Sequence, residues 1–119
     1  MSVEKANIGT DVIEVNRFRK MPIMSHHSFY ESIFTNSEMK YCLKYTDPYP
    51  HLAGIFAAKE AIIKCLNRPL QMSHIEIGRE KEGRPIVVID NDNSYNIKIS
   101  ISHTRSLAIA VALVTDLLG

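Results

Sequence analysis

The stretch from Leu52 to Lys64, LAGIFAAKEAIIK, decides the fold of this chain. Its apolar residues recur close to the spacing of one buried helical face, which predicts a long helix. The same helix carries Glu60 and Lys64 four residues apart, so both side chains leave it on one side. Charges on an apolar helix cost desolvation energy unless something compensates them. Taken alone, the pair also matches an exposed helical ion pair worth roughly a few tenths of a kcal/mol, so other parts of the chain must decide.

Helix start and stop signals define the segments around this helix. Thr35 and Glu38 have the spacing of a capping box, which predicts a helix from there to about Tyr45. Thr46-Asp47-Pro48 predicts a second helix start, with the proline at the first position of the long helix. That helix should end near Asn67, because a proline follows closely.

The remaining segments are typical of β-strands. In residues 97–101 isoleucine alternates with polar residues, which predicts a half-buried strand. Residues 107–114 form a continuous apolar run, whose length and β-branched content favour a buried strand over a helix. Further strands are expected at residues 7–15, interrupted by a turn-like Gly9-Thr10-Asp11, and at residues 75–77 and 85–89. Long helices with hairpin-like strands predict one α+β domain over residues 1–119.

Composition argues against several classes of function. The net charge of +1 gives no electrostatic case for nucleic acid or an anionic membrane, although Arg17-Phe18-Arg19-Lys20 is a dense local basic cluster. No apolar run reaches membrane-spanning length, and the first residues lack the layout of a signal peptide. Cys42 and Cys65 form no metal-spaced motif and are expected to be buried free thiols. We therefore expect a cytoplasmic protein that does not bind a membrane.

Two polar residues stand out from the apolar strands. Asp11 lies in the first strand segment, and His103 lies where the strand at residues 97–101 ends. Taken alone, Asp11 also fits a turn aspartate and His103 a structural histidine. Together with Glu60 and Lys64, they supply two carboxylates, a fixed cation and an imidazole, which suits Mg²⁺ held by carboxylates and substrate phosphates. Neither a structural zinc site nor a nucleotide-binding glycine loop is indicated.

Nearly the whole chain resembles one known family. The segment Gly9-Thr10-Asp11-Val12-Ile13-Glu14-Val15 resembles its N-terminal Gly-x-Asp motif, and FAAKEAIIK, Phe56 to Lys64, resembles its central signature. Ile99-Ser100-Ile101-Ser102-His103-Thr104 is similar to its third motif, and Phe34 to Glu38 is similar to its Thr-x-x-Glu helix start. On these motifs, in this order, the chain resembles the 4′-phosphopantetheinyl transferases of the holo-acyl-carrier-protein synthase type.

The resemblance implies a fold and a reaction. It implies a compact α+β subunit, an antiparallel sheet packed with a long central helix, that assembles as a homotrimer with sites between subunits. The implied reaction transfers phosphopantetheine from coenzyme A to a serine of an acyl carrier protein, or of a polyketide or peptide carrier domain. It releases 3′,5′-ADP and requires Mg²⁺.

The resemblance also implies roles for individual residues. Asp11 and Glu60 would hold Mg²⁺, and Glu60, or a metal-bound water beside it, would accept the serine proton. Lys64 would stabilise or protonate the leaving diphosphate. His103 would contact a phosphate of coenzyme A. Further coenzyme A contacts are expected at Ser102, Thr104 and Arg84.

A docking surface for the carrier protein is expected on the basic cluster. By resemblance, Arg17 matches the basic residue of the family's first helix. With Arg19 and Lys20 it would bind the acidic recognition helix that carrier proteins present. A solvated basic face without a partner is the alternative for these three residues.

The chain departs from the family pattern at three places. Ile55 stands where the family often has an arginine, and Asn67 to Met72 lack the glycines of the usual loop. The segment from Asp90 to Tyr95 is also shorter than the family usually has between strands. These departures suggest a divergent member that serves a specialised carrier. A non-catalytic trimeric module that binds coenzyme A or a carrier protein is the second interpretation. The joint presence of Asp11, Glu60 and Lys64 favours the enzyme, because two carboxylates without a metal repel each other.

Overall fold

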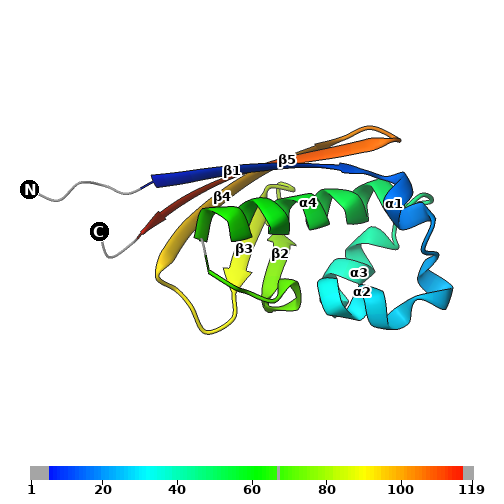
Figure 1. Cartoon of the computed structure of the whole chain (residues 1–119), viewed down its shortest axis with the longest axis horizontal. Coiled ribbons are helices and arrows are strands. Elements are labelled where there is room, and N and C mark those ends of the chain that lie inside the picture. The colour runs from blue at the N-terminus through cyan, green and yellow to red at the C-terminus, as the bar shows by residue number, and fades with distance from the viewer. Residues whose placement is uncertain (1–5, 67, 117–119) are drawn as a thin grey trace, which may run out of the picture.

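The computed structural model describes residues 6–66 and 68–116. Three short helices, one long helix and two antiparallel sheets make up this part of the chain (Figure 1). The helices are α1 (Asn16–Arg19), α2 (His27–Ile33), α3 (Asn36–Cys42) and α4 (Tyr49–Leu66), with 3-10 turns at Ile23–Ser25 and Met72–His74. The strands are β1 (Ala6–Glu14), β2 (Ile75–Arg79), β3 (Pro85–Ile89), β4 (Tyr95–His103) and β5 (Leu107–Asp116). The α+β class predicted from the sequence is confirmed.

The main sheet is antiparallel, with the strand order β1-β5-β4. Helix α4 lies along one face of this sheet, and β5 presents to it the small side chains of Ala108, Ala110 and Ala112, all fully buried (Figure 1). Small residues at alternate positions let the helix approach the strand closely, since successive side chains of a strand point to opposite faces. The sheet and the helix thereby form the frame on which the polar residues are mounted.

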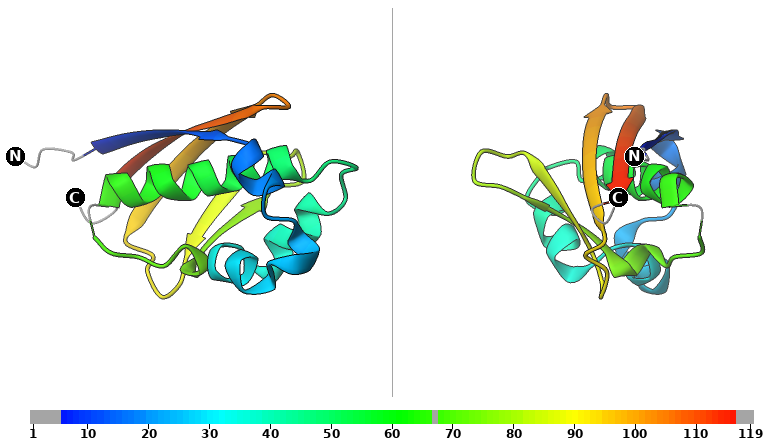
Figure 2. Two further views of the ribbon diagram at one scale, coloured as in Figure 1. Left: turned by 45° about the vertical axis from the view of Figure 1, so that its right-hand side comes forward. Right: turned by 90° about the vertical axis from the view of Figure 1, so that its left-hand side faces the viewer.

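The second sheet is the β2–β3 hairpin, paired antiparallel. Figure 2 shows this hairpin beside α4, while α1, α2 and α3 gather around the N-terminal half of α4. An aromatic cluster fills the space between these helices: the ring of Phe18 lies 5.3 Å from Phe56, 6.1 Å from Phe34 and 6.2 Å from Tyr30. Such rings contribute large buried areas and tilted contacts to a core.

Several expectations hold and others need correction. The capping box of Thr35 and Glu38 is present, but α3 ends at Cys42 rather than near Tyr45. Helix α4 begins at Tyr49, one residue later than expected, and ends at Leu66. The expected end at residue 67 lies outside the described residues.

Two interpretations of the strands are wrong. Strand β1 is continuous, so Gly9-Thr10-Asp11 is no turn, because its whole length pairs with β5. The run at residues 107–114 is a strand, as expected, but it is buried on one face only. Its leucine, isoleucine and valine side chains at 107, 109, 111 and 113 point away from α4 and are 38% to 46% exposed.

Both cysteines are free and buried, as expected. Burial raises the pKa of the Cys42 thiol to about 12 and also raises that of Cys65, which makes both thiols weak nucleophiles. In the described part of the chain, no helix is long and apolar enough to cross a membrane.

Candidate functional site

A close approach of β1 to α4 builds the first part of the site. A Cβ atom on Gly9 would lie 2.4 Å from the carbonyl oxygen of Ala61 and 3.0 Å from Sγ of Cys65. Only glycine fits against that backbone carbonyl, which explains the glycine of the Gly-x-Asp pattern. Asp11, two residues further along the strand, faces α4 from the same side of the sheet.

Asp11 and Lys64 form an ion pair across this junction. Nζ of Lys64 lies 3.3 Å from Oδ1 of Asp11 and donates a hydrogen bond of 3.0 Å to the carbonyl of Thr10. The other carboxylate oxygen, Oδ2, is buried and has no hydrogen-bond partner among the described residues. A buried, unpartnered carboxylate oxygen is costly, so this atom is suited to bind a cation.

Glu60 supplies the second carboxylate. It lies on α4 one helical turn before Lys64, is half-buried, and leaves the helix on the same side. The described residues contain no cluster of three or more His, Cys, Asp or Glu side chains able to hold a metal. A pair of carboxylates is nevertheless what Mg²⁺ uses when substrate phosphates and water complete its octahedral shell. Asp11 and Glu60 therefore fit Mg²⁺ and do not fit a closed protein site.

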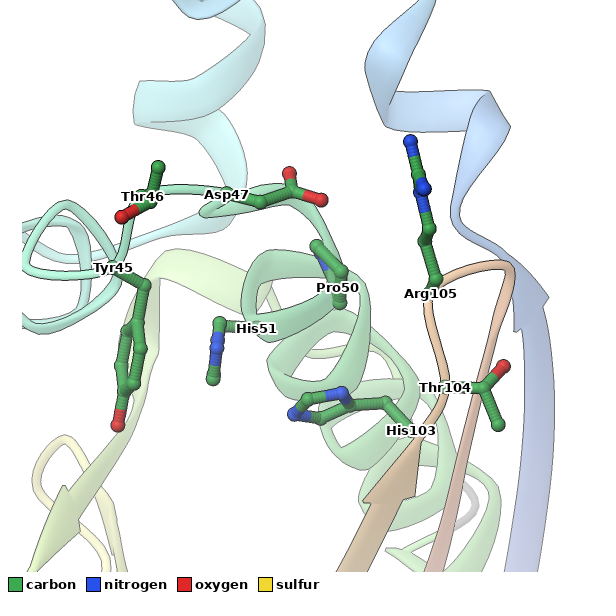
Figure 3. A pocket seen from close by; sticks show the side chains of 8 residues that line it. All are labelled: Tyr45, Thr46, Asp47, Pro50, His51, His103, Thr104 and Arg105. Carbon is green, nitrogen blue, oxygen red and sulfur yellow. The ribbon is translucent and has the colours of Figure 1, made fainter.

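The second part of the site surrounds His103 at the end of β4. His103 lies at the mouth of a pocket of about 400 Å³, lined also by Tyr45, His51 and Arg105 (Figure 3). The rings of Tyr45 and His51 are stacked with centroids 3.5 Å apart. The His103 ring meets His51 at 4.6 Å and an angle of 71°. Aromatic and imidazole rings thus converge where the strand ends.

The two parts lie at opposite ends of α4. Lys64 is in the last turns of the helix and His51 in the first, so about 20 Å of helix axis separates them at 1.5 Å per residue. Strand β5 also lies between β1, which carries Asp11, and β4, which carries His103. One subunit therefore does not gather all the expected residues around one point.

The remaining coenzyme A candidates have different surroundings. Ser102 is exposed on the sheet face that points away from α4. The hydroxyl of Thr104 accepts hydrogen bonds from the backbone N–H groups of Ser106 and Leu107, so it fixes the β4–β5 turn. Arg84 is exposed at the start of β3 and lines a groove of about 460 Å³ between β3 and β4, together with Lys98.

The three residues of the basic cluster, Arg17, Arg19 and Lys20, differ in their surroundings. The guanidinium of Arg17 lies 5.0 Å above the ring of Phe56, and Arg17 and Lys20 are exposed. Arg19 instead donates to both carboxylate oxygens of Asp47, at 2.9 and 2.7 Å. This ion pair raises the pKa of Arg19 and lowers that of Asp47. Arg19 thus anchors the segment before α4, while the other two side chains face solvent.

Sequence reasoning missed the neighbours of His103. Tyr45 and His51 were assigned no role, although Tyr45 shortly precedes the long helix and His51 lies in its first turn. Nothing in the local pattern marks them, because Tyr45 acts through its stack on His51, and the contact of His51 with His103 joins residues about fifty positions apart. The spacing of His51 within α4 could only have indicated that it shares a helix with Glu60.

On the face of the main sheet that points away from α4, strands β1 and β5 carry exposed apolar side chains, whereas β4 presents Lys98, Ser100 and Ser102. The apolar side chains have exposed fractions from 38% for Val111 to 75% for Ile8. The other members of this apolar group are Val12, Leu107, Ile109 and Leu113. Contiguous apolar side chains on a surface are typical of an interaction site. We call this apolar group the outer sheet face.

Comparisons with known proteins identify the family. Residues 7–112 match the model of the 4′-phosphopantetheinyl transferase superfamily. A holo-[acyl-carrier-protein] synthase of Thermodesulfovibrio yellowstonii is 36% identical over 110 residues, which are 91% of this chain and 96% of that protein. The holo-[acyl-carrier-protein] synthase of Chlorobaculum parvum is 40% identical over 115 residues, with 92% and 98% covered.

Solved structures agree with this sequence relationship. The holo-(acyl-carrier-protein) synthase of Bacillus anthracis, crystallised in complex with CoA (3′,5′-ADP), has a TM-score of 0.82 and 28% identity, over 96% of this chain and 99% of that one. The Helicobacter pylori holo-[acyl-carrier-protein] synthase in complex with coenzyme A has a TM-score of 0.79 and 28% identity, over 90% and 98%. The resemblance seen in the three motifs is thereby confirmed, and this chain belongs to the 4′-phosphopantetheinyl transferase superfamily.

Proposed function

We propose that this protein transfers 4′-phosphopantetheine from coenzyme A to a serine of an apo acyl carrier protein, with Mg²⁺, and releases 3′,5′-ADP. The family membership and the synthase names of its relatives support the reaction. The observation that carries it is the Asp11–Lys64 pair, in which one carboxylate oxygen is buried with no partner among residues 6–66 and 68–116, beside an exposed ammonium. That arrangement suits the pyrophosphate of coenzyme A together with a cation.

The reaction exchanges one phosphorus–oxygen bond for another. The serine hydroxyl oxygen attacks the phosphorus that bears the pantetheine, and the bond from that phosphorus to the bridging pyrophosphate oxygen breaks. The serine proton passes to a base, and 3′,5′-ADP leaves with the bridging oxygen. Such transfers depend mainly on positioning and on stabilising charge in the transition state.

Each polar residue of the first cluster has a part in this scheme. Glu60 is the base that accepts the serine proton, since it is the half-buried carboxylate beside the pair. Lys64, held by the carbonyl of Thr10 and by Asp11, directs its ammonium charge to the leaving diphosphate. His103 binds a phosphate of coenzyme A, and Ser102, Thr104 and Arg84 contribute further contacts.

Asp11 and Glu60 would hold Mg²⁺, with Oδ2 of Asp11 as the free ligand atom. When bound, the ion offsets the negative charge that builds up on the pyrophosphate oxygens. The protein side chains orient the pyrophosphate of coenzyme A, accept the serine proton and neutralise the charge of the leaving 3′,5′-ADP.

We propose that three copies of the chain assemble through the outer sheet face, with the sites between subunits. Two observations support this assembly. The outer sheet face is apolar and would be covered by neighbouring copies. In addition, the Asp11 and His103 clusters lie at opposite ends of α4, so a neighbouring subunit is needed to bring both to one ligand. Replacing Val111 by Lys should dissociate the trimer, as measured by sedimentation velocity.

We also propose that the carrier protein docks on the exposed side chains of Arg17 and Lys20, next to which Arg19 is held by Asp47. Their charge complements an acidic carrier helix and would mainly raise the association rate. The carrier is an acyl carrier protein or a polyketide or peptide carrier domain. The protein would work in the cytoplasm as one domain over residues 1–119, in line with its buried free thiols.

The test is the intact mass of an apo acyl carrier protein after incubation with this protein, coenzyme A and Mg²⁺. We expect the gain of one phosphopantetheine, and no gain when EDTA is added. Glu60→Gln should abolish transfer without changing the melting temperature, whereas Glu31→Gln, at an exposed glutamate of α2, should transfer normally. Binding of coenzyme A without any transfer would support the non-catalytic module instead.

A further inference from the structure

A chain of ring contacts leads from β2 to His103. The guanidinium of Arg79 on β2 lies 4.8 Å above the ring of Tyr41, whose hydroxyl lies 3.1 Å from that of Tyr45. Tyr45 is stacked on His51 at 3.5 Å and 14°. His51 in turn meets His103 edge to face at 4.6 Å (Figure 3). Segments far apart in the sequence thus combine to contact one ring at the end of β4.

Among the aromatic ring contacts of the described residues, His103 meets only His51. His103 is the last residue of β4, and its side chain is exposed, so the strand alone leaves its ring free to change rotamer. The half-buried His51, fixed on α4 and stacked on Tyr45, removes much of that freedom. A ring held in advance loses less entropy when a ligand binds it.

We propose that His51 is a positioning residue, which stacks on Tyr45 and holds the His103 imidazole ready to donate a hydrogen bond to a phosphate of the substrate. This inference rests on the proposed function, in which His103 binds a phosphate of coenzyme A. The ligand class is therefore a phosphorylated adenosine such as 3′,5′-ADP. His51 acts through His103 and does not itself touch the ligand.

The charges around His51 fit this role. The titratable and charged groups that face it from the neighbouring elements are Tyr41, Tyr45, Asp47, Arg79 and His103. Burial, followed by repulsion from His103 and Arg79, lowers the pKa of His51, and Asp47 opposes this only in part. Two imidazolium rings at this distance would repel each other. The lowered pKa of His51 favours its neutral form, which places no positive charge beside the His103 ring.

Calorimetric binding of coenzyme A and of 3′,5′-ADP tests the role. His51→Ala should weaken both roughly tenfold and raise KM for coenzyme A, with kcat nearly unchanged, since only the ordering of His103 is lost. His51→Phe keeps the stack and the edge contact and should stay within about twofold of wild type. Tyr45→Ala, at an exposed residue, removes the stack without altering His51 and should weaken binding in the same direction. His74→Ala, at an exposed histidine outside the pocket, is the control.

A spectroscopic test measures the coupling directly. In an NMR pH titration of the imidazole resonances, His103→Gln should raise the pKa of His51, because the repelling neighbour is removed. The variant His74→Gln should leave it unchanged. An unchanged His51 pKa in His103→Gln would show that the two rings do not interact, which overturns the proposal.

The binding outcomes separate this proposal from the proposed function. Unchanged affinity in both His51→Ala and Tyr45→Ala, with wild-type binding intact, overturns the positioning role alone. Equal loss in His51→Phe and His51→Ala also overturns it, because His51 would then contact the ligand itself. If the wild-type protein binds neither coenzyme A nor 3′,5′-ADP, the proposed function fails and the positioning role fails with it.

Discussion

Helix α4 carries two lysines with carboxylate partners, and their surroundings are opposite. Lys59 is fully buried, and its ammonium donates to Glu38 at 2.7 Å and to the carbonyls of Ile33 and Met72 at 2.6 and 2.8 Å. The Lys64 side chain is 54% exposed and reaches Asp11 at 3.3 Å. One helix therefore holds a closed ion pair and an open one.

The closed pair ties the fold together. Besides Lys59, Glu38 accepts hydrogen bonds from the backbone N–H groups of Thr35 and Ile77, at 2.8 and 2.7 Å. Burial lowers the pKa of Lys59, while the charge of Glu38 opposes that shift. All three ammonium hydrogens have acceptors, so nothing remains for a ligand. The pair joins α2, α3, α4 and β2.

In the open pair of Asp11 and Lys64, by contrast, the hydrogen-bonding groups are only partly satisfied. Oδ2 of Asp11 has no partner among the described residues, and the ammonium of Lys64 faces solvent. Residue type alone does not distinguish these two pairs. They differ in how far their hydrogen-bonding groups are satisfied, and unsatisfied charged groups are the ones able to bind a ligand.

The same substitution at both lysines should give opposite results. Lys59→Met leaves Glu38 buried and uncompensated, so we expect the free energy of unfolding to fall by about 3–5 kcal/mol. Urea denaturation at a fixed protein concentration measures this loss, because the proposed assembly would make stability depend on concentration. A variant with wild-type stability would show that the buried pair is dispensable.

Lys64→Met is the matched control and the second prediction. It should change stability by less than about 1 kcal/mol, since the pair is partly exposed. It should lower the rate of phosphopantetheine transfer on the order of a hundredfold, because the leaving diphosphate loses a positive charge. The rate is measured by the mass of the carrier protein over time. Normal turnover in this variant would refute the role of Lys64.

Gly9→Ala tests whether the close packing of β1 on α4 is needed for the Asp11–Lys64 ion pair. The added Cβ collides with the carbonyl of Ala61, which is backbone and cannot rotate away. We expect a loss of about 1–3 kcal/mol in unfolding free energy, as for other overpacked sites. Transfer activity should also fall, because β1 carries Asp11 away from Lys64. Gly78→Ala, where a Cβ meets no atom, is the control and should stay near wild type.

The partly exposed ion pair of Arg19 and Asp47 should have the smallest effect. In the folded protein the pKa of Asp47 lies below its ordinary value, because the Asp47 carboxylate accepts hydrogen bonds from Arg19. The stabilisation is therefore complete above the ordinary pKa of aspartate and is lost as the pH falls through the lowered pKa. Asp47→Asn should reduce stability by less than about 1 kcal/mol at pH 7. The difference from wild type should shrink as the pH is lowered from 7 through the lowered pKa of Asp47, as thermal melting over an acid pH series would show.

Much of the secondary structure could be predicted from the sequence, because it depends on interactions between residues close together in the chain. The capping box at Thr35 and the alternating isoleucines of β4 were correctly interpreted from spacing alone. Asp11 was also a candidate, but its turn-like neighbours concealed that β1 is continuous. Gly9 resembles a turn residue in sequence, yet here it allows two elements to touch.

Local sequence patterns were enough to predict the long helix, α3 and most strands, the order of the motifs and the residue types of the candidate site, because periodicity, capping and turn chemistry act over a few residues. Only the tertiary structure decided which charges are satisfied. It buried Lys59 against Glu38, left Oδ2 of Asp11 open, and brought His51 to His103. The physical reason is that burial and pairing depend on contacts between residues far apart in the chain, and no local pattern records those contacts.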